Sequence, residues 1–347
     1  MTKMKPLINH QYNWHTKASS LAKEINLQNK VVLITGATNG IGLATSKALL
    51  KAEAKVIVAV RNLELAKKRF QKFPNVIYKY LDLANIDSIR SLIKEIKDEN
   101  WKIDYLINNA GVMGGKKTLD ENGLEKHFKV NYLASFILTM GLINSLVPHS
   151  RIINLSSVAH KWSRIHFEDI NFASRTYNTK LAYGQSKTAA ILFTQKLANL
   201  LANKHIETFS VHPGIIPLSN LWSPKNKILK FSVKGLVAIL KFLQVATLLN
   251  LFSWLIRSNI VKHFKTNNQG ASTTLWSLIS PEISPFNGAY LEDCNLYPLV
   301  DPQAKVATGL AKYAHDPKKA QALWDYSLRL LKKLNIYEEI MPNLDIV

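Results

Sequence analysis

The sequence predicts an α/β fold in which a doubly wound parallel sheet forms the core of a single domain. Two observations carry this prediction: apolar, β-branched segments alternate with segments of helical apolar spacing, and a glycine-rich turn follows the first strand. Such alternation is typical of a parallel sheet with helices on both faces. We expect strands near 31–35, 55–60, 76–80, 104–107, 151–155 and 206–211, and helices near 41–52, 62–72, 86–98, 121–147, 182–203 and 317–333.

The first strand and the turn after it predict a Rossmann-type dinucleotide site. Residues 30–35 form a short apolar run bounded by polar residues, as expected for a buried parallel strand. Gly36, Gly40 and Gly42 follow in a Gly-x-x-x-Gly-x-Gly spacing. A strand, a tight turn and a helix bring backbone N–H groups to a pyrophosphate. The alternative is a turn that only packs the helix on the strand, and the strand near 55–60 argues against it.

Tyr183 and Lys187 lie four residues apart within an expected helix, so their side chains share one helical face. A free phenol titrates near ~10, which is too high for proton transfer at neutral pH. A neighbouring ammonium group would lower that pKa and make Tyr183 a usable general acid or base. A solvated helix face is the alternative for an isolated pair, but this pair follows a glycine turn.

Together these residues resemble the short-chain dehydrogenase/reductase family, and the resemblance spans about 30–300. It implies a nicotinamide cofactor bound by the glycine turn, the Asp-Leu after the third strand, the Asn-Asn-Ala-Gly after the fourth and the Pro-Gly after the sixth. The implied cofactor-binding residues are Gly36, Thr38, Asn39, Gly40, Ile41, Gly42, Asp82, Leu83, Asn109, Ala110, Gly111, Tyr183, Lys187, Pro213, Gly214 and Ile216.

The same resemblance implies a catalytic set of Asn131, Ser157, Tyr183 and Lys187. Tyr183 would exchange a proton with the substrate oxygen, while Ser157 would hydrogen-bond that oxygen. Lys187 would lower the pKa of Tyr183 and hold the nicotinamide ribose, and Asn131 would hold the backbone and a water of a proton relay. No metal site is expected.

Within the family, the pattern is closest to retinol-dehydrogenase-like and WW-domain-oxidoreductase-like members. Residues 18–27, 157–160, 269–274 and 288–294 carry this narrower resemblance. Substrate identity does not follow from it, because loops outside the shared catalytic residues set the substrate.

The end of the second strand favours NADP(H) over NAD(H). NAD-binding chains place an acidic residue there to bind both ribose hydroxyls, whereas this chain has Arg61 and no acid. A guanidinium group can pair with a 2′-phosphate through two hydrogen bonds. A solvated surface arginine is the alternative.

The chain of 347 residues divides into an N-terminal extension, 1–29, and the dehydrogenase-like domain, 30–347. The extension has no apolar core of signal-peptide type, and we expect it to wrap the domain or to be partly disordered. The single cysteine, Cys294, excludes an intrachain disulfide and suits a reducing compartment, so we expect a cytoplasmic protein.

The domain carries an enlarged apolar substrate lid at about 215–266. Residues 208–281 contain no Asp or Glu but eight Lys or Arg, and the stretch 235–256 has one charge in 22 residues. Both ends of this stretch belong to one domain, so a monotopic contact of residues 223–265 with an anionic membrane surface fits better than a span. A lid that packs on its own domain or on a second subunit is the equal alternative.

A formal net charge of +21 suits an anionic membrane surface and would equally suit nucleic acid. No nucleic-acid module with interleaved aromatic residues occurs, so we expect a small lipophilic substrate and no nucleic-acid partner. The resemblance also allows a homodimer. 

Leu218 stands where relatives have a Thr or Ser that binds the nicotinamide carboxamide, with Ser219 one place later. Two functions stay open. The first is an NADP(H)-dependent oxidoreductase that interconverts a lipophilic aldehyde or ketone and its alcohol. The second is a non-catalytic NADP(H)-binding sensor or partner-recruiting protein. The four intact catalytic residues favour the enzyme, and Leu218 favours the alternative.

Overall fold

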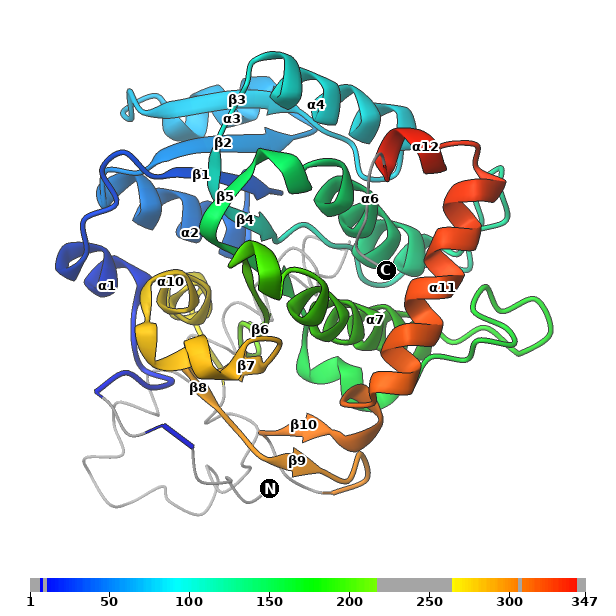
Figure 1. Cartoon of the computed structure of the whole chain (residues 1–347). Coiled ribbons are helices and arrows are strands. Elements are labelled where there is room, and N and C mark those ends of the chain that lie inside the picture. The colour runs from blue at the N-terminus through cyan, green and yellow to red at the C-terminus, as the bar shows by residue number, and fades with distance from the viewer. Residues whose placement is uncertain (1–6, 9–10, 217–263, 305–307, 342–347) are drawn as a thin grey trace, which may run out of the picture.

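The computed structural model describes residues 7–8, 11–216, 264–304 and 308–341 (Figure 1). Most of the expected lid at 215–266, including the apolar stretch 235–256, lies outside these residues, as do Leu218 and Ser219. Among the helices in the described ranges, none is long and apolar enough to cross a membrane.

One eight-stranded sheet organises the described chain, with the strand order β3-β2-β1-β4-β5-β6-β7-β8 (Figure 1). Every neighbouring pair is parallel except β7 with β8. The strands are β1 (Val31–Thr35), β2 (Lys55–Val60), β3 (Val76–Tyr80), β4 (Ile103–Asn108), β5 (Leu146–Leu155), β6 (Glu207–His212), β7 (Tyr290–Glu292) and β8 (Asn295–Leu296). The strand order reverses between β1 and β4, which is where open α/β sheets bind ligands.

Helices cover both faces of this sheet, which confirms the doubly wound fold (Figure 1). The helices whose apolar residues pack on one face are α1 (Ala18–Glu24), α2 (Gly40–Lys51), α3 (Leu63–Phe70) and α10 (Ser272–Ile279). Those on the other face are α4 (Ile86–Asp98), α6 (Ala134–Gly141), α7 (Thr179–Leu200), α11 (Pro317–Lys333) and α12 (Tyr337–Ile340). The short helices α5 (Lys126–Phe128) and α9 (Asn267–Gly270) and the two-stranded pair of β9 (Leu299–Val300) with β10 (Leu310–Ala311) complete these elements.

The expected helix at 121–147 is wrong at both ends. Helix α5 begins only at Lys126, where the Glu125 side chain accepts a hydrogen bond from the Phe128 N–H and caps it. A π-helical turn at 129–133 joins α5 to α6, which ends at Gly141, and β5 already begins at Leu146. The apolar periodicity continues across these junctions because the residues are buried whatever their backbone conformation, so periodicity alone did not reveal the ends.

Part of the segment 1–29 belongs to the hydrophobic core. Helix α1 packs against α2 and α10, and its Leu21 side chain is fully buried together with Ala18. Leu27 is buried in the same cluster, and its backbone N–H donates to the Ala52 carbonyl. A helix of seven residues is too short to reveal itself by periodicity in a polar segment.

Candidate active site

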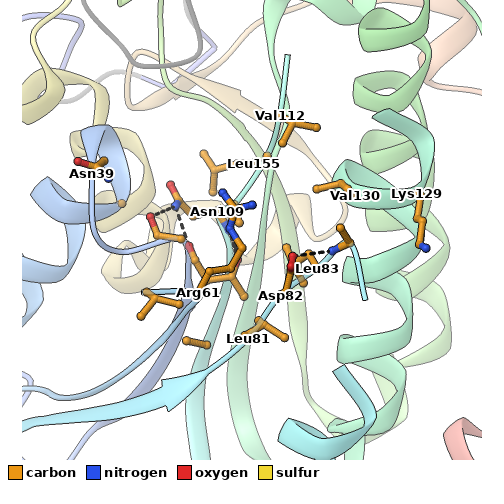
Figure 2. Close-up of a pocket in the computed structure, with 18 of the residues that line it drawn as sticks. Asn39, Arg61, Leu81, Asp82, Leu83, Asn109, Val112, Lys129, Val130 and Leu155 are labelled. Atoms are coloured by element: carbon orange, nitrogen blue, oxygen red, sulfur yellow. Dashed lines mark hydrogen bonds between the residues drawn. The ribbon is translucent and has the colours of Figure 1, made fainter. Parts of the chain in front are cut away.

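The main pocket of the described chain opens at the carboxyl ends of the parallel strands and has a volume of about 670 Å³. This volume falls within the range of ~300–1,000 Å³ that ligand sites have. Figure 2 shows Asn39 and Arg61 toward one side of it, Val130 and Lys129 toward the other, and Asn109 between them. The predicted site residues that line it are Gly36, Thr38, Asn39, Gly40, Ile41, Gly42, Arg61, Asp82, Leu83, Asn109, Ala110, Gly111, Tyr183, Lys187 and Pro213.

The glycine turn leaves room for an anionic group beside the N-terminus of α2. Gly36 has a φ of +70°, and a Cβ atom there would lie 2.9 Å from the Ala110 Cβ. A Cβ atom on Gly42 would lie 2.4 Å from the Gly36 carbonyl oxygen, whereas one on Gly40 would meet nothing within 4 Å. The Asn39 side chain does not cap the helix. Tight packing behind the turn and open space at Gly40 therefore fit a pyrophosphate at the helix N-terminus.

The end of the pocket next to β2 and β3 carries the residues expected to bind the adenosine half of a cofactor. Asp82 Oδ1 accepts a hydrogen bond from the Ala84 N–H at 3.0 Å, while the Asp82 N–H donates to Ser88 Oγ at 2.9 Å. Arg61 is exposed at the pocket wall, and within the described ranges no carboxylate forms an ion pair with it. Its guanidinium group is thus available to an anionic ligand.

Hydrogen bonds join the ends of β1 and β4 under the pocket floor. Thr35 Oγ1 accepts from the N–H groups of Asn109 and Ala110, at 3.1 and 3.0 Å. The Asn109 amide donates in return to the Thr35 carbonyl at 2.7 Å. A Cβ atom on Gly111 would lie 3.2 Å from Asn131 Oδ1, so the side chain of a larger residue would displace that amide.

Tyr183 and Lys187 project from α7 into the pocket and are both buried. The Lys187 Nζ donates to the Leu155 carbonyl at 2.7 Å and lies 5.6 Å from the centroid of the Tyr183 ring. Burial lowers the pKa of Lys187 to about 8. Burial also raises the pKa of Tyr183 to about 12, although a hydrogen bond with Ser157 opposes the rise.

The sequence predicts that Lys187 lowers the pKa of Tyr183; burial makes the net shift of that pKa upward, and the effect of Lys187 on it stays a prediction. Desolvation raises the pKa and the hydrogen bond with Ser157 lowers it, while the Lys187 ammonium group hydrogen-bonds a backbone carbonyl. Tyr183 therefore keeps its proton at neutral pH, as an ordinary phenol also does. Sequence spacing placed the two side chains on one face, but it did not show how deeply both are buried.

Ser157 and Asn131 do not line the pocket but contact residues that do. Ser157 Oγ accepts a hydrogen bond from the Ala159 N–H at 3.2 Å. The Ser157 side chain also hydrogen-bonds Tyr183. Asn131 Oδ1 accepts from the Val112 N–H at 2.7 Å, and its Nδ2 donates to the Val112 carbonyl at 3.0 Å. Asn131 Nδ2 also donates to Ser186 Oγ at 3.0 Å. Its amide thus ties the loop after β4 to the π-helical turn and to α7.

Of the described residues that follow β6, only Pro213 lines the pocket. A Cβ atom on Gly214, whose φ is +90°, would lie 2.5 Å from the Lys265 side chain, and a Cβ on Gly270 would meet Ile216 at 2.4 Å. Gly214 and Ile216 therefore pack behind the wall. The contact that Leu218 or Ser219 would make lies outside the described residues.

Sequence reasoning missed a second wall formed by the loop after β4 and by α5 with its π-helical turn. Its pocket-lining residues are Val112, Thr118, Leu119, Asp120, Leu124, Lys126, Lys129 and Val130. Lys129 is buried and forms an ion pair with Asp120 across this wall. A buried charge pair nine residues apart in a loop-to-helix segment leaves no periodic signal, so only the fold could identify it.

Comparison with known proteins finds one matching family, together with relatives and solved structures that this chain resembles. The family described as short chain dehydrogenase matches residues 30–228. Retinol dehydrogenase 12 of Mus musculus is 33% identical over 315 residues, which is 88% of this chain and 88% of that protein. An uncharacterised protein of Mycobacterium paratuberculosis superposes with a TM-score of 0.64 at 27% identity, covering 90% of this chain and 97% of that one. The NADP complex of Pseudomonas aeruginosa RhlG superposes with a TM-score of 0.57 at 22% identity, covering 77% and 95%.

We predict that Lys187 destabilises the folded protein at neutral pH. Its folded pKa of about 8 lies below the ordinary 10.5. This difference corresponds to a cost of ~3 kcal/mol while the group is charged in both states. Above pH 8 the folded state releases the proton first, so the cost shrinks and vanishes near pH 10.5. Lys187→Met should therefore raise the free energy of unfolding by ~1–3 kcal/mol at pH 7 and by little at pH 10.

Urea unfolding at the two pH values measures this difference. Lys180→Met, at an exposed position in the first turn of the same helix, is the control and should change stability little at either pH. A Lys187→Met protein that is less stable than the wild type at pH 7 would contradict the prediction.

Proposed function

Because this chain belongs to the short chain dehydrogenase family, we propose that it is an NADP(H)-dependent enzyme that interconverts a lipophilic aldehyde or ketone and its alcohol. The family membership makes it an oxidoreductase of alcohol or carbonyl groups with a nicotinamide cofactor. The resemblance to retinol dehydrogenases is confirmed by the relatives. The cofactor preference, the substrate class and the roles of individual residues are the proposal.

One observation carries the catalytic part of the proposal. A buried tyrosine and a buried lysine line the same pocket as the glycine turn, and a serine hydrogen-bonds the tyrosine hydroxyl. A protein that only binds a dinucleotide has no use for a buried phenol next to a buried ammonium group, each of which costs free energy. The combination is what proton transfer to a substrate oxygen needs.

The chain's own residues move the proton and hold the substrate oxygen. A bound nicotinamide would supply or accept the hydride at the carbon atom. Tyr183, protonated at neutral pH, donates its proton to the carbonyl oxygen, and Ser157 hydrogen-bonds that oxygen as negative charge develops. Lys187, whose pKa is about 8, is mostly charged at pH 7 and stabilises the phenolate that remains. A phenol that keeps its proton suits the direction of reduction.

The residues that would hold the cofactor are consistent with this arrangement. The N-terminus of α2 and the Gly36–Gly42 turn would bind the pyrophosphate, and Asp82 and Leu83 would bound the adenine. Arg61 would pair with a 2′-phosphate, since within the described chain it has no carboxylate partner. This exposed, unpaired guanidinium supports NADP(H) over NAD(H).

A membrane contact through residues 223–265 is part of the proposal, although only Phe264 and Lys265 of that segment are described. The eight basic and no acidic residues of 208–281 support attraction to anionic head groups at the cytoplasmic surface of a membrane. We expect the protein to sediment with vesicles that contain anionic lipid and not with neutral vesicles. Protein that stays in the supernatant with both kinds of vesicle at low salt would refute the contact.

Sedimentation velocity of the protein tests the homodimer. A species of 39.2 kDa is a monomer and would exclude the homodimer.

Tyr183→Phe should abolish carbonyl reduction while leaving cofactor binding intact. The phenol supplies the proton, and removal of a general acid costs ~10²–10⁴-fold in rate. NADPH absorbance, followed with retinal, steroid ketones and medium-chain aldehydes, measures the rate, and NADPH fluorescence measures binding. Tyr177→Phe, which removes a hydroxyl that bonds Glu125, is a matched control outside the pocket lining.

Two results would overturn this assignment. A Tyr183→Phe protein as active as the wild type would remove Tyr183 from the reaction. Tight NADPH binding by the wild type without turnover on any carbonyl would favour the sensor or partner-recruiting function.

Arg61→Ala should weaken NADPH binding by about 10-fold or more and leave NADH binding within about twofold. The guanidinium group pairs only with the 2′-phosphate, which NADH lacks. Fluorescence titration with both cofactors measures the two dissociation constants. Lys67→Ala on α3 is the control, because Lys67 already pairs with Glu64 at 2.9 Å. An equal loss for NADH and NADPH would contradict the proposed role.

A further inference from the structure

A buried histidine lies directly behind Ser157 and has no part in the proton transfer proposed above. His160 is fully buried in the short 3-10 helix at 158–162, which begins after Ser157. Its ring packs 4.9 Å from the Tyr290 ring on β7. Both ring nitrogens have partners, so His160 is not an unused core residue.

The two partners allow one protonation state only. His160 Nδ1 lies 2.7 Å from the Ser157 carbonyl oxygen, which can only accept, so Nδ1 carries the proton. The Ala311 N–H donates to Nε2 at 3.0 Å, so Nε2 must carry a lone pair. A second ring proton, on Nε2, would point at the hydrogen of the Ala311 N–H and repel it. Burial lowers the pKa of His160 to about 3, and the ring is therefore neutral throughout the physiological range.

The first of these bonds holds the Ser157 backbone. The Ser157 carbonyl accepts from both the His160 ring and the His160 backbone N–H, which lies at 3.0 Å. The Ser157 side-chain oxygen accepts a hydrogen bond from the Ala159 N–H at 3.2 Å. Two hydrogen bonds thus hold the Ser157 carbonyl, and the side chain of the same residue hydrogen-bonds Tyr183.

The second bond connects this turn to the C-terminal segment 308–313. Besides Ala311, Tyr313 contributes a hydroxyl that donates to the His160 carbonyl at 2.6 Å. Lys161 Nζ donates to the Thr308 carbonyl at 3.1 Å. On α7, Thr188 Oγ1 lies 3.1 Å from the His160 carbonyl oxygen and 2.7 Å from that of Ser163, so these two carbonyls compete for its one proton. The turn after Ser157 thus lies between α7, which carries Tyr183, and a segment more than 120 residues further along the chain.

We propose that His160 is a positioning residue for Ser157, and that its Nδ1–H bond to the Ser157 carbonyl sets where the Ser157 hydroxyl lies relative to Tyr183. The proposal rests on the reaction proposed above, in which Ser157 holds the substrate oxygen. The reaction then requires the Nδ1–H hydrogen bond to Ser157 and does not depend on the volume of the His160 ring.

Two amide variants separate the two hydrogen bonds of the ring. The Asn side-chain amide reaches the place of Nδ1, so His160→Asn keeps a donor for the Ser157 carbonyl and loses the acceptor for Ala311. The longer Gln amide reaches the place of Nε2, so His160→Gln keeps the acceptor and loses the donor.

We expect kcat to fall about 10- to 100-fold in His160→Gln, because small misplacements of a reacting geometry have effects of this size. In His160→Asn kcat should stay within about threefold of the wild type, and the Kd for NADPH should stay within about twofold in both. His315→Asn and His315→Gln, at an exposed position near the same segment, are controls for the exchange of histidine by an amide. Thermal unfolding is measured for all variants.

A kcat of His160→Gln equal to that of the wild type would overturn the proposal. The proposal would also be overturned if kcat decreased across the variants only in proportion to Tm, because a purely structural role of His160 predicts that correlation. Crystal structures of both variants with NADP⁺ give a readout apart from activity: Ser157 Oγ should move away from the Tyr183 hydroxyl in the Gln variant and stay in the Asn variant.

These measurements distinguish the proposed function from the proposed role of His160. A wild type that reduces no carbonyl would refute the proposed function, and the positions of Ser157 in the two crystal structures would then decide the role of His160. An unmoved Ser157 in the Gln variant would refute that role even if the wild type proves to be an active reductase.

Discussion

The parallel pairing of the sheet is the constraint on which the rest of the structure depends. Because β3, β2, β1, β4, β5 and β6 run in one direction, their carboxyl ends meet at a single edge. Residues as distant in sequence as Gly36, Arg61, Asn109 and Pro213 therefore line one pocket. Helix α7 packs beside this edge, and the Lys187 bond to the last carbonyl of β5 joins the helix to it.

Burial is what gives the site its chemistry, and it acts on each group differently. Desolvation raises the pKa of Tyr183, so the phenol keeps its proton, and it lowers the pKa of Lys187 toward neutrality. Desolvation also lowers the pKa of His160 and keeps it neutral, while its two hydrogen bonds fix a single tautomer. Of these three groups only Lys187 is charged at neutral pH, so it alone carries the cost of burying a charge.

Much of the fold was predictable because strands and long helices leave local signals. Six of the seven parallel strands were expected, five of them within one residue at each end, since buried β-branched runs and the glycine turn are read directly from the chain. The sixth, β5, begins five residues before the expected 151–155. The break between α5 and α6, the short helix α1 and strands β7 to β10 were not expected. Each is either too short to show a period or has a π-helical turn whose burial hides the change of backbone.

The sequence by itself determined the fold class, the family and which residue types stand at the pocket, because these depend on local patterns and on spacing along the chain. Only the tertiary structure decided how those residues behave. The pKa shifts of Tyr183 and Lys187 come from burial, and Lys187 hydrogen-bonds a backbone carbonyl 32 residues away. The partners of His160 and the ion pair of Lys129 likewise come from segments that meet only in the folded chain. Electrostatic effects depend on distance in space and on burial, and a sequence records neither.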